Sequence, residues 1–186
     1  MDPDEVMLEC EERMEKAVEF LKNEYRTIRT GRAGTGLVEN IRVDYYGSPT
    51  PLKQLAGIAI PEARLIVIKP YDRAALGEIE KAILKSELGI TPQSDGKVIR
   101  LSVPPLSEEN RKKLVAQVKD MAEQQRVSIR HIRHDAIKKM EEAEKKSDIT
   151  EDDLHRYKDA IQDLTKKYEE EISKVLEAKS EEVMEV

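Results

Sequence analysis

The stretch that decides the fold runs from residue 107 to residue 146 and reads SEENRKKLVAQVKDMAEQQRVSIRHIRHDAIKKMEEAEKK. Its apolar residues recur every three or four positions, the period of one face of an α-helix. They are Leu114, Val118, Met121, Ile129, Ile132, Ala136, Met140 and Ala143, with Gln125 as a polar interruption. Ser107 can cap the helix start, and Glu108 and Glu109 place negative charge in its first turn. We therefore expect a long helix from about Glu108 to Lys146.

Two more segments carry the same pattern. The stripe of residues 4–29 consists of Met7, Cys10, Met14, Ala17, Leu21, Tyr25 and Ile28. The stripe of residues 151–182 consists of Leu154, Tyr157, Ile161, Leu164, Tyr168, Ile172 and Val175, and continues to Val183. Thr150 followed by Glu151, Asp152 and Asp153 is typical of a capping box, with Asp in the place of Glu. No helix can bury so narrow a stripe alone, so the three predict an antiparallel bundle.

Residues 31–104 have a different character. Ile41, Val43 and Tyr45 alternate with polar residues, which predicts a strand, and residues 47–51 predict a turn. We expect further strands at residues 58–60, 65–69 and 97–103, a loop at 91–96, and a helix from Asp72 to Leu88 that Gly89 ends. The predicted fold class is α+β: an antiparallel three-helix bundle, residues 1–30 and 105–186, with an inserted small β/α/β domain, residues 31–104.

The insertion makes the chain cross between the two domains twice. The first crossing is expected at Thr30, Gly31 and Arg32, and the second at Val103, Pro104 and Pro105. Glycine gives freedom to the first linker, and proline limits the second. We interpret the pair as a hinge; the alternative is that these residues are ordinary loop breakers.

The composition speaks against a typical α/β enzyme, since 38% of the residues are charged and 4% aromatic. Gly31 and Gly36 have the spacing of a phosphate-binding loop, but Leu37 stands where that loop requires lysine. The three histidines, His131, His134 and His155, form no metal-binding motif. Cys10 lies on an apolar stripe, where a buried thiol is expected. We therefore expect no enzyme, no metal and no cofactor.

The amino-terminal residues 1–12 are acidic and lack the basic start of a secretory signal. No apolar run approaches the length that crosses a membrane. These features predict a cytoplasmic protein with no membrane partner.

Charge is distributed unevenly along the chain, whose net charge is −6. Residues 111–139 hold nine basic and three acidic residues, a net +6, which leaves −12 for the rest. On a helix, Lys112, Lys119, Arg126, Arg130 and Arg133 fall within a stripe about 60° wide. Guanidinium groups match phosphate oxygens, so the stripe predicts a nucleic-acid interface to which Arg29 and Arg32 add charge. The alternative is pairing with the acidic helix at 151–182, as in a coiled-coil adaptor that binds proteins only.

Several ordered stretches resemble one family, the ribosome recycling factors. They are Ile28–Ala33, Val43–Gly47, Pro49–Leu52 with Gln54–Ala56, Glu80–Ile83, Ser86–Gly89, Ile99–Leu101, Pro104–Leu106, and Arg126 with Ile129–Arg130, Ile132–Arg133 and Asp135–Ala136. The resemblance covers essentially the whole chain. It implies a three-helix bundle and a β/α/β domain in an L-shaped arrangement, acting as a monomer.

The resemblance also implies a function. Such a factor binds the post-termination ribosome at the large subunit and, with elongation factor G and its GTP hydrolysis, splits it into subunits. The family pattern implies that Arg133 contacts ribosomal RNA, with Arg29, Arg32 and Arg130 at basic positions nearby. The sequence departs from the family pattern in two places. His134 stands where many relatives have arginine, and residues 33–36 are richer in glycine, which we expect to loosen the hinge.

Overall fold

The computed structural model describes residues 2–185, so residues 1 and 186 of the predicted bundle lie outside the described residues. The chain divides into two compact units. The first comprises the residues up to Asn23 together with Leu114–Glu181, and the second comprises Glu24–Lys113 together with the residues from Glu182 onward. The three long helices described next each contribute residues to both units.

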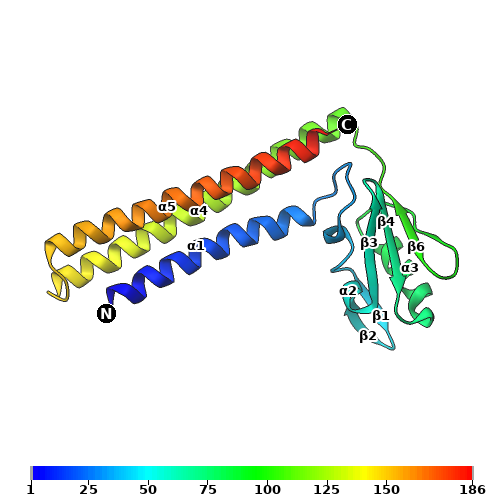
Figure 1. Ribbon diagram of the computed structural model, residues 1–186, viewed down its shortest axis with the longest axis horizontal. Helices are drawn as coiled ribbons and strands as arrows, with labels where there is room; N and C mark the ends of the chain where they lie inside the picture. Colours follow the sequence, from blue (N-terminus) through cyan, green and yellow to red (C-terminus); the bar gives the residue numbers. More distant parts are fainter. Residues whose placement is uncertain (1, 186) are drawn as a thin grey trace. The chain divides into compact units, whose positions relative to one another are not determined.

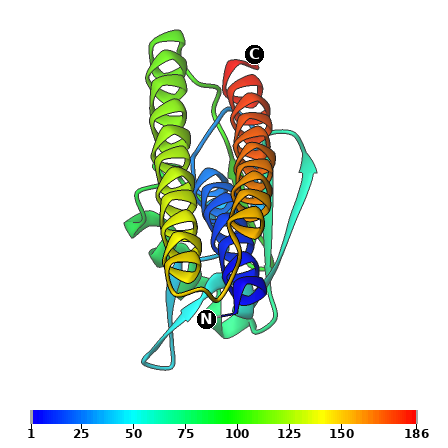
Figure 2. The same cartoon turned by 90° about the vertical axis from the view of Figure 1, so that its left-hand side faces the viewer.

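The first unit is a bundle of three long helices, α1 (Pro3–Arg26), α4 (Glu108–Lys145) and α5 (Glu151–Met184), which lie side by side (Figures 1 and 2). Ion pairs join α1 to α4 in antiparallel order: Lys139 Nζ lies 2.6 Å from Glu9 Oε2, and Arg13 Nη2 lies 3.1 Å from Asp135 Oδ2. Along α5 the order is parallel to α1, since the Tyr157 hydroxyl donates to Asp4 and, further along both helices, the Tyr168 hydroxyl donates to Glu11. The predicted antiparallel bundle is confirmed.

The ends of the long helices follow from local capping. The Ser107 hydroxyl accepts the amide of Asn110 at 3.2 Å, which starts α4 where predicted. At the start of α5, the Thr150 hydroxyl accepts the Asp153 amide at 3.1 Å, and the Asp153 carboxylate accepts the Thr150 amide at 3.2 Å. Helix α1 ends at Arg26, earlier than predicted, because the amides of the next two residues bond to carbonyls three positions back.

The predicted stripes form the bundle core. Met14, Leu21, Ile129, Met140 and Ile161 are fully buried. Two polar residues of α5 that the stripe did not include are buried as well. The Thr165 hydroxyl bonds back to the Ile161 carbonyl at 2.8 Å, and Lys179 is only 9% exposed. A hydroxyl that bonds its own helix can enter a core without an unpaired donor.

The second unit contains a four-stranded antiparallel sheet in the order β3-β4-β6-β5. Its strands are β3 (Ala56–Glu62), β4 (Leu65–Pro70), β5 (Gln93–Ser94) and β6 (Ile99–Ser102). A short helix α2 (Leu52–Leu55) precedes β3, and helix α3 (Leu76–Lys85) follows β4. One core joins the sheet to α3 through Ile66, Ile68, Leu101, Ile79 and Ile83.

The remaining strands, β1 (Arg42–Tyr45) and β2 (Ser48–Pro51), form a hairpin. The predicted turn at residues 47–51 is therefore wrong. The turn is shorter, at Tyr46 (φ 51°) and Gly47 (φ 81°), and the following residues pair with β1. Left-handed conformation at both central residues matches the twist of a two-residue hairpin loop. Strand β5 likewise lies in the predicted loop at 91–96.

Before α3, the Asp72 carboxylate accepts the Ala74 amide at 2.9 Å, capping a short 3-10 turn (Arg73–Ala75) that leads into the helix. The helix ends at Lys85, three residues before the predicted Leu88. Gly89 has φ +70°, the left-handed conformation that favours glycine after a helix.

Candidate nucleic-acid interface

Helix α4 places basic residues at seven-residue intervals: Lys112, Lys119, Arg126 and Arg133, with Arg130 beside the last two. Seven residues are close to two helical turns, so these side chains stay on nearly one edge of the helix. Its buried residues border that edge, among them Val118, Ile129 and Ile132. We call Lys119, Arg126, Arg130 and Arg133, which belong to the first unit, the basic edge.

Arg126 is held against α5. Its side chain is 23% exposed, and its Nη2 donates a hydrogen bond of 2.8 Å to the hydroxyl of Ser173. The Nη1 atom lies 3.6 Å from a carboxylate oxygen of Glu123 on its own helix. The contact with α5 is therefore with a neutral group, which positions the guanidinium without cancelling its charge.

Arg133 is held in the same way. Its Nη1 donates to the amide oxygen of Gln162 at 3.2 Å, again a neutral partner on α5. Its Nε is shielded from solvent and, within residues 2–185, has no hydrogen-bond partner. A half-buried guanidinium with a neutral acceptor keeps its full positive charge at the bundle surface.

Arg130 differs, because carboxylates surround it. Its Nη2 lies 3.1 Å from Glu123 and its Nε lies 3.6 Å from Glu169 of α5. Within residues 2–185, Glu169 is the α5 carboxylate that pairs with an arginine of the basic edge. The alternative of general pairing with the acidic helix thus applies to Arg130 and not to Arg126 or Arg133. Lys119 is exposed.

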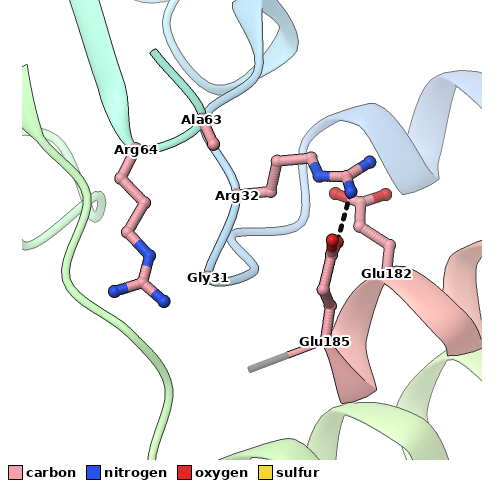
Figure 3. A pocket seen from close by; sticks show the side chains of 6 residues that line it. All are labelled: Gly31, Arg32, Ala63, Arg64, Glu182 and Glu185. Carbon is pink, nitrogen blue, oxygen red and sulfur yellow. Dashed lines mark hydrogen bonds and ion pairs between the residues drawn. The ribbon is translucent and has the colours of Figure 1, made fainter.

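The other predicted RNA-binding residues, Arg29, Arg32 and Lys112, belong to the second unit and are described by themselves. Arg29 is half-buried, and its Nε is shielded and, within residues 2–185, without a hydrogen-bond partner. Lys112 is exposed and lies 3.4 Å from Glu108 one turn earlier. Arg32 forms an ion pair with Glu185 (Figure 3). Glu185 therefore offsets part of the charge that Arg32 could offer to a phosphate.

The two predicted linkers lie next to each other in the second unit. A Cβ atom added to Gly31 would lie 3.8 Å from Pro105 Cα and from Leu106 N. The turn between β3 and β4 holds both linkers: the Ala33 amide donates to the Ala63 carbonyl at 2.7 Å, and the Val103 amide donates to the Arg64 carbonyl at 2.8 Å. A small pocket of about 130 Å³ lies here, lined by Gly31, Arg32, Ala63, Arg64, Glu182 and Glu185 (Figure 3).

Gly36 corrects one expectation about this segment. A Cβ atom added there would lie 2.5 Å from the Arg26 carbonyl oxygen, closer than real Cβ atoms come. Gly36 is buried in a short 3-10 turn (Thr35–Leu37). This glycine permits close packing of two backbone segments, and does not loosen the chain.

Two features bear on the expectation of no catalytic site. Within residues 2–185, no group of three His, Cys, Asp or Glu side chains could hold a metal ion. Cys10 is buried, and burial raises the pKa of its thiol to about 11. A thiol with such a pKa is a poor nucleophile near neutral pH.

In the same described range, no helix is long and apolar enough to cross a membrane.

Sequence reasoning missed the residues that hold the arginines and the first linker. Gln162, Ser173 and Glu169 are polar residues on an exposed helix face, and nothing in their spacing indicated which arginine each would meet. Glu182 and Glu185 contact residues about 150 positions away. Such pairs can be identified only from the three-dimensional structure.

The fold and the site together define a class of α+β proteins in which a three-helix bundle with a basic helix edge occurs in one chain with a small α/β unit. The chain belongs to one family of that class, the ribosome recycling factors, which its sequence matches over residues 21–184. Curated relatives named ribosome-recycling factor include one from Oleidesulfovibrio alaskensis, 51% identical over 98% of this chain and 100% of the relative. Another, from Caldicellulosiruptor saccharolyticus, is 53% identical over 95% of this chain and 96% of the relative.

Solved structures similar to this one include two of ribosome recycling factors. The solution structure of a ribosome recycling factor matches with a TM-score of 0.79 and 44% identity, covering 100% of this chain and 99% of the other. A T. thermophilus ribosome recycling factor, from models in which it and the E. coli elongation factor G are bound to the E. coli post-termination complex, matches with a TM-score of 0.71. Its identity is 36%, and the match covers 100% of both chains. The resemblance and the fold class predicted from the sequence are confirmed.

Proposed function

We propose that this protein binds the post-termination ribosome at its large subunit. Together with elongation factor G and its GTP hydrolysis, it then splits the ribosome into subunits. The observation that carries the proposal is the basic edge: Arg126 and Arg133 meet neutral partners on α5, so the acidic helix does not neutralise them. Membership in the ribosome recycling factor family and the likeness to a relative from models that include a post-termination complex support it.

In this proposal the basic edge contacts ribosomal RNA through phosphates. Arg133, Arg130, Arg126 and Lys119 would supply contacts from the first unit, and Arg29, Arg32 and Lys112 from the second. A rigid helix edge suits such contacts, because A-form RNA is recognised mostly by shape and backbone charge. The loss of counterions from the RNA then makes binding weaken as salt rises.

The proposal treats residues 31–104 as a domain inserted in the bundle and the linkers around Thr30–Arg32 and Val103–Pro105 as its hinge. The adjacency of Gly31 to Pro105 and Leu106 supports this, since two adjacent linkers allow rotation about one place. The energy for splitting would come from the partner's nucleotide, and this chain would act as a monomeric, cytoplasmic, non-catalytic factor.

Cosedimentation with isolated large and small subunits over a salt series tests the proposal. Three proteins are compared: the wild type, a variant with Arg126, Arg130 and Arg133 changed to glutamine, and a control with Arg156, Lys166 and Lys174 of α5 changed to glutamine. Both variants lose the same charge. We expect the wild type and the control to bind large subunits alike, and the basic-edge variant to bind weakly with a shallower salt dependence.

Equal loss of binding in both variants would show that only net charge matters. Absence of binding by the wild type would instead favour a helical adaptor that binds proteins only, for which the pairing of Arg130 with Glu169 is the supporting observation. A subunit-splitting assay with elongation factor G and GTP then tests the function itself.

A further inference from the structure

The bundle has a groove on the face formed by α1 and α5, and neither the fold nor the proposed RNA contact uses it. The groove has a volume of about 500 Å³. Met7 and Leu8 of α1 and Ala160 and Leu164 of α5 line it with apolar atoms. Figure 2 shows the first turns of α1 beside α5. The residues that line the groove belong to these two helices.

Leu8 is an apolar residue of the groove that is largely exposed to solvent. It is 59% exposed, although it belongs to a helix whose stripe for the core is complete without it. Phe20, on the same helix, is 54% exposed but lines no part of the groove. Single exposed apolar side chains are common on surfaces, whereas one that lies in an apolar hollow marks an interaction site.

The rim of the groove is acidic. Glu11 and Asp163 stand against one basic residue, Lys167. The Lys167 ammonium lies 3.6 Å from Glu11, so these two charges offset each other and Asp163 carries the excess negative charge of the rim. The ammonium also lies 4.9 Å from the centre of the Tyr168 ring. Burial and then the charge of Glu11 raise the pKa of Tyr168, and Glu15 and Glu171 add to this effect, so carboxylates continue beyond the rim.

The helices that form the groove carry the same sign over their whole length. α1 holds eight acidic and four basic residues, and α5 holds eleven acidic and six basic. α4, which carries the basic edge, holds ten basic and eight acidic residues. Phosphate would be repelled from the α1–α5 face, and a basic partner would be attracted to it.

We infer that the groove between α1 and α5 binds a basic amphipathic helix of a protein partner, which inserts an apolar side chain beside Leu8 while its lysines and arginines face Asp163 and the further carboxylates beyond the rim. α1 and α5 run parallel, and a groove between two such helices is the usual seat for the apolar face of a third. The carboxylates attract a basic partner and repel the phosphates of a nucleic acid. The protein therefore has a protein-binding face distinct from its basic edge.

The test is a titration of the full chain, isotope-labelled at leucine and methionine methyl groups, observed by NMR. Three probes are used: a synthetic helical peptide with leucines at positions i, i+3 and i+4 and lysines and arginines elsewhere, its twin with glutamate in place of every basic residue, and a single-stranded oligoribonucleotide. We expect the basic peptide to shift the methyl signals of Met7, Leu8 and Leu164 in a saturable way, and the other two probes to leave them unchanged.

Matched variants locate the site. Leu8→Lys should weaken binding of the basic peptide about tenfold or more, because it removes an apolar contact and adds repulsion. Phe20→Lys, an equal charge change at an equally exposed residue of α1, should leave affinity within about twofold. Asp163→Lys should weaken binding, and Asp159→Lys outside the groove should weaken it less. Helical content by circular dichroism verifies that each variant is folded.

The inference is overturned if the glutamate peptide or the RNA shifts the groove methyls as strongly as the basic peptide does. It is also overturned if Phe20→Lys weakens binding as much as Leu8→Lys, or if no probe shifts these signals. None of these results depends on ribosome binding, so the inference and the proposed function can fail separately.

Discussion

The hydroxyl of Thr30 donates a hydrogen bond of 2.9 Å to the Oε1 atom of Glu182, across 152 residues of sequence. Thr30 is 1% exposed, and its hydroxyl oxygen also accepts the Arg32 amide at 3.2 Å. One small side chain therefore joins the first linker to the last turn of α5. This bond and the Arg32–Glu185 ion pair next to it tie the carboxyl-terminal residues to that linker.

Thr30→Val should lower the free energy of unfolding by about 1–2 kcal/mol. Valine keeps the shape of threonine but removes a donor and an acceptor that are both used in a buried place. Urea unfolding followed by circular dichroism measures the change. Thr91→Val, at an exposed threonine before β5, is the control and should change stability by less than about 0.5 kcal/mol. Equal effects of the two substitutions would show that the Thr30 hydrogen bonds contribute no more to the free energy of unfolding than the hydroxyl of an exposed threonine does.

Arg133→Ala should reduce affinity for large ribosomal subunits by about 1–3 kcal/mol, the scale of a charge-assisted contact, and flatten the salt dependence. Thermal stability should change by about 1 kcal/mol or less, because the contact with Gln162 is a single exposed hydrogen bond. Arg133→Lys keeps the charge but loses the planar fork, so we expect an intermediate affinity. Cosedimentation and thermal unfolding give the two readouts.

The control for Arg133 is Arg156→Ala, which removes one charge from an exposed position of α5. It should leave ribosome affinity unchanged. If Arg133→Ala instead lowers the melting temperature and leaves affinity unaltered, Arg133 is a structural arginine of the bundle, and the adaptor alternative gains.

Gly31→Pro should leave both units folded but impair subunit splitting, because proline fixes one torsion of the proposed hinge and restricts the residue before it. Gly31→Ala is the matched control, since its added Cβ would make only ordinary contacts at 3.8 Å. We expect Gly31→Ala to split subunits at nearly the wild-type rate. Light scattering of ribosomes with elongation factor G and GTP measures the rate, and unchanged splitting by a folded Gly31→Pro variant would speak against a working hinge.

Asp95 predicts an acid-sensitive turn between β5 and β6. The Val98 amide, the Arg100 guanidinium and the Lys97 amide all bond to its carboxylate and hold its pKa well below the usual range. A lowered pKa means that the stabilisation is present above the unfolded-state value of 3.8 and is lost as pH falls below it. Asp95→Asn should therefore make the hydrogen-exchange protection of the amides of residues 97 and 98 less dependent on pH between about 4 and 2 than in the wild type.

Asp159→Asn, at an exposed aspartate in the middle of α5, is the control for that titration and should keep the wild-type pH dependence. A wild-type turn that stays equally protected from pH 7 to pH 2 would contradict the assigned role of Asp95.

Most of the helical architecture could be predicted because its signals are local. Ser107 and Thr150 cap helices by contacts three residues away, and the apolar stripes repeat within each helix. Strand β2 was missed because Pro49 and Pro51 are typical of a turn, yet a hairpin edge tolerates residues without an amide hydrogen. Lys179 was missed because long charged side chains are rarely buried, and only its neighbours determine that it is.

The candidate interface also has a part that could be predicted from the sequence and a part that could not. The positions of the arginines on one edge of α4 follow from helical period alone. Which of them pair with the acidic helix depends on the α5 residues opposite, Gln162, Ser173 and Glu169. The register between two helices cannot be deduced from the sequence of either one.

The separation of charge within the bundle has a consequence for how the molecule approaches a partner. The edge of α4 with excess positive charge and the α1–α5 face with excess negative charge form an electric dipole across the bundle. In the field of a polyanionic surface such a dipole experiences a torque before any atoms touch. The molecule would then approach in a defined orientation, with its basic edge toward the polyanionic surface and its acidic groove away from it. The time needed to reach the productive orientation would be shorter. The rate of productive encounter would fall as added salt screens the field.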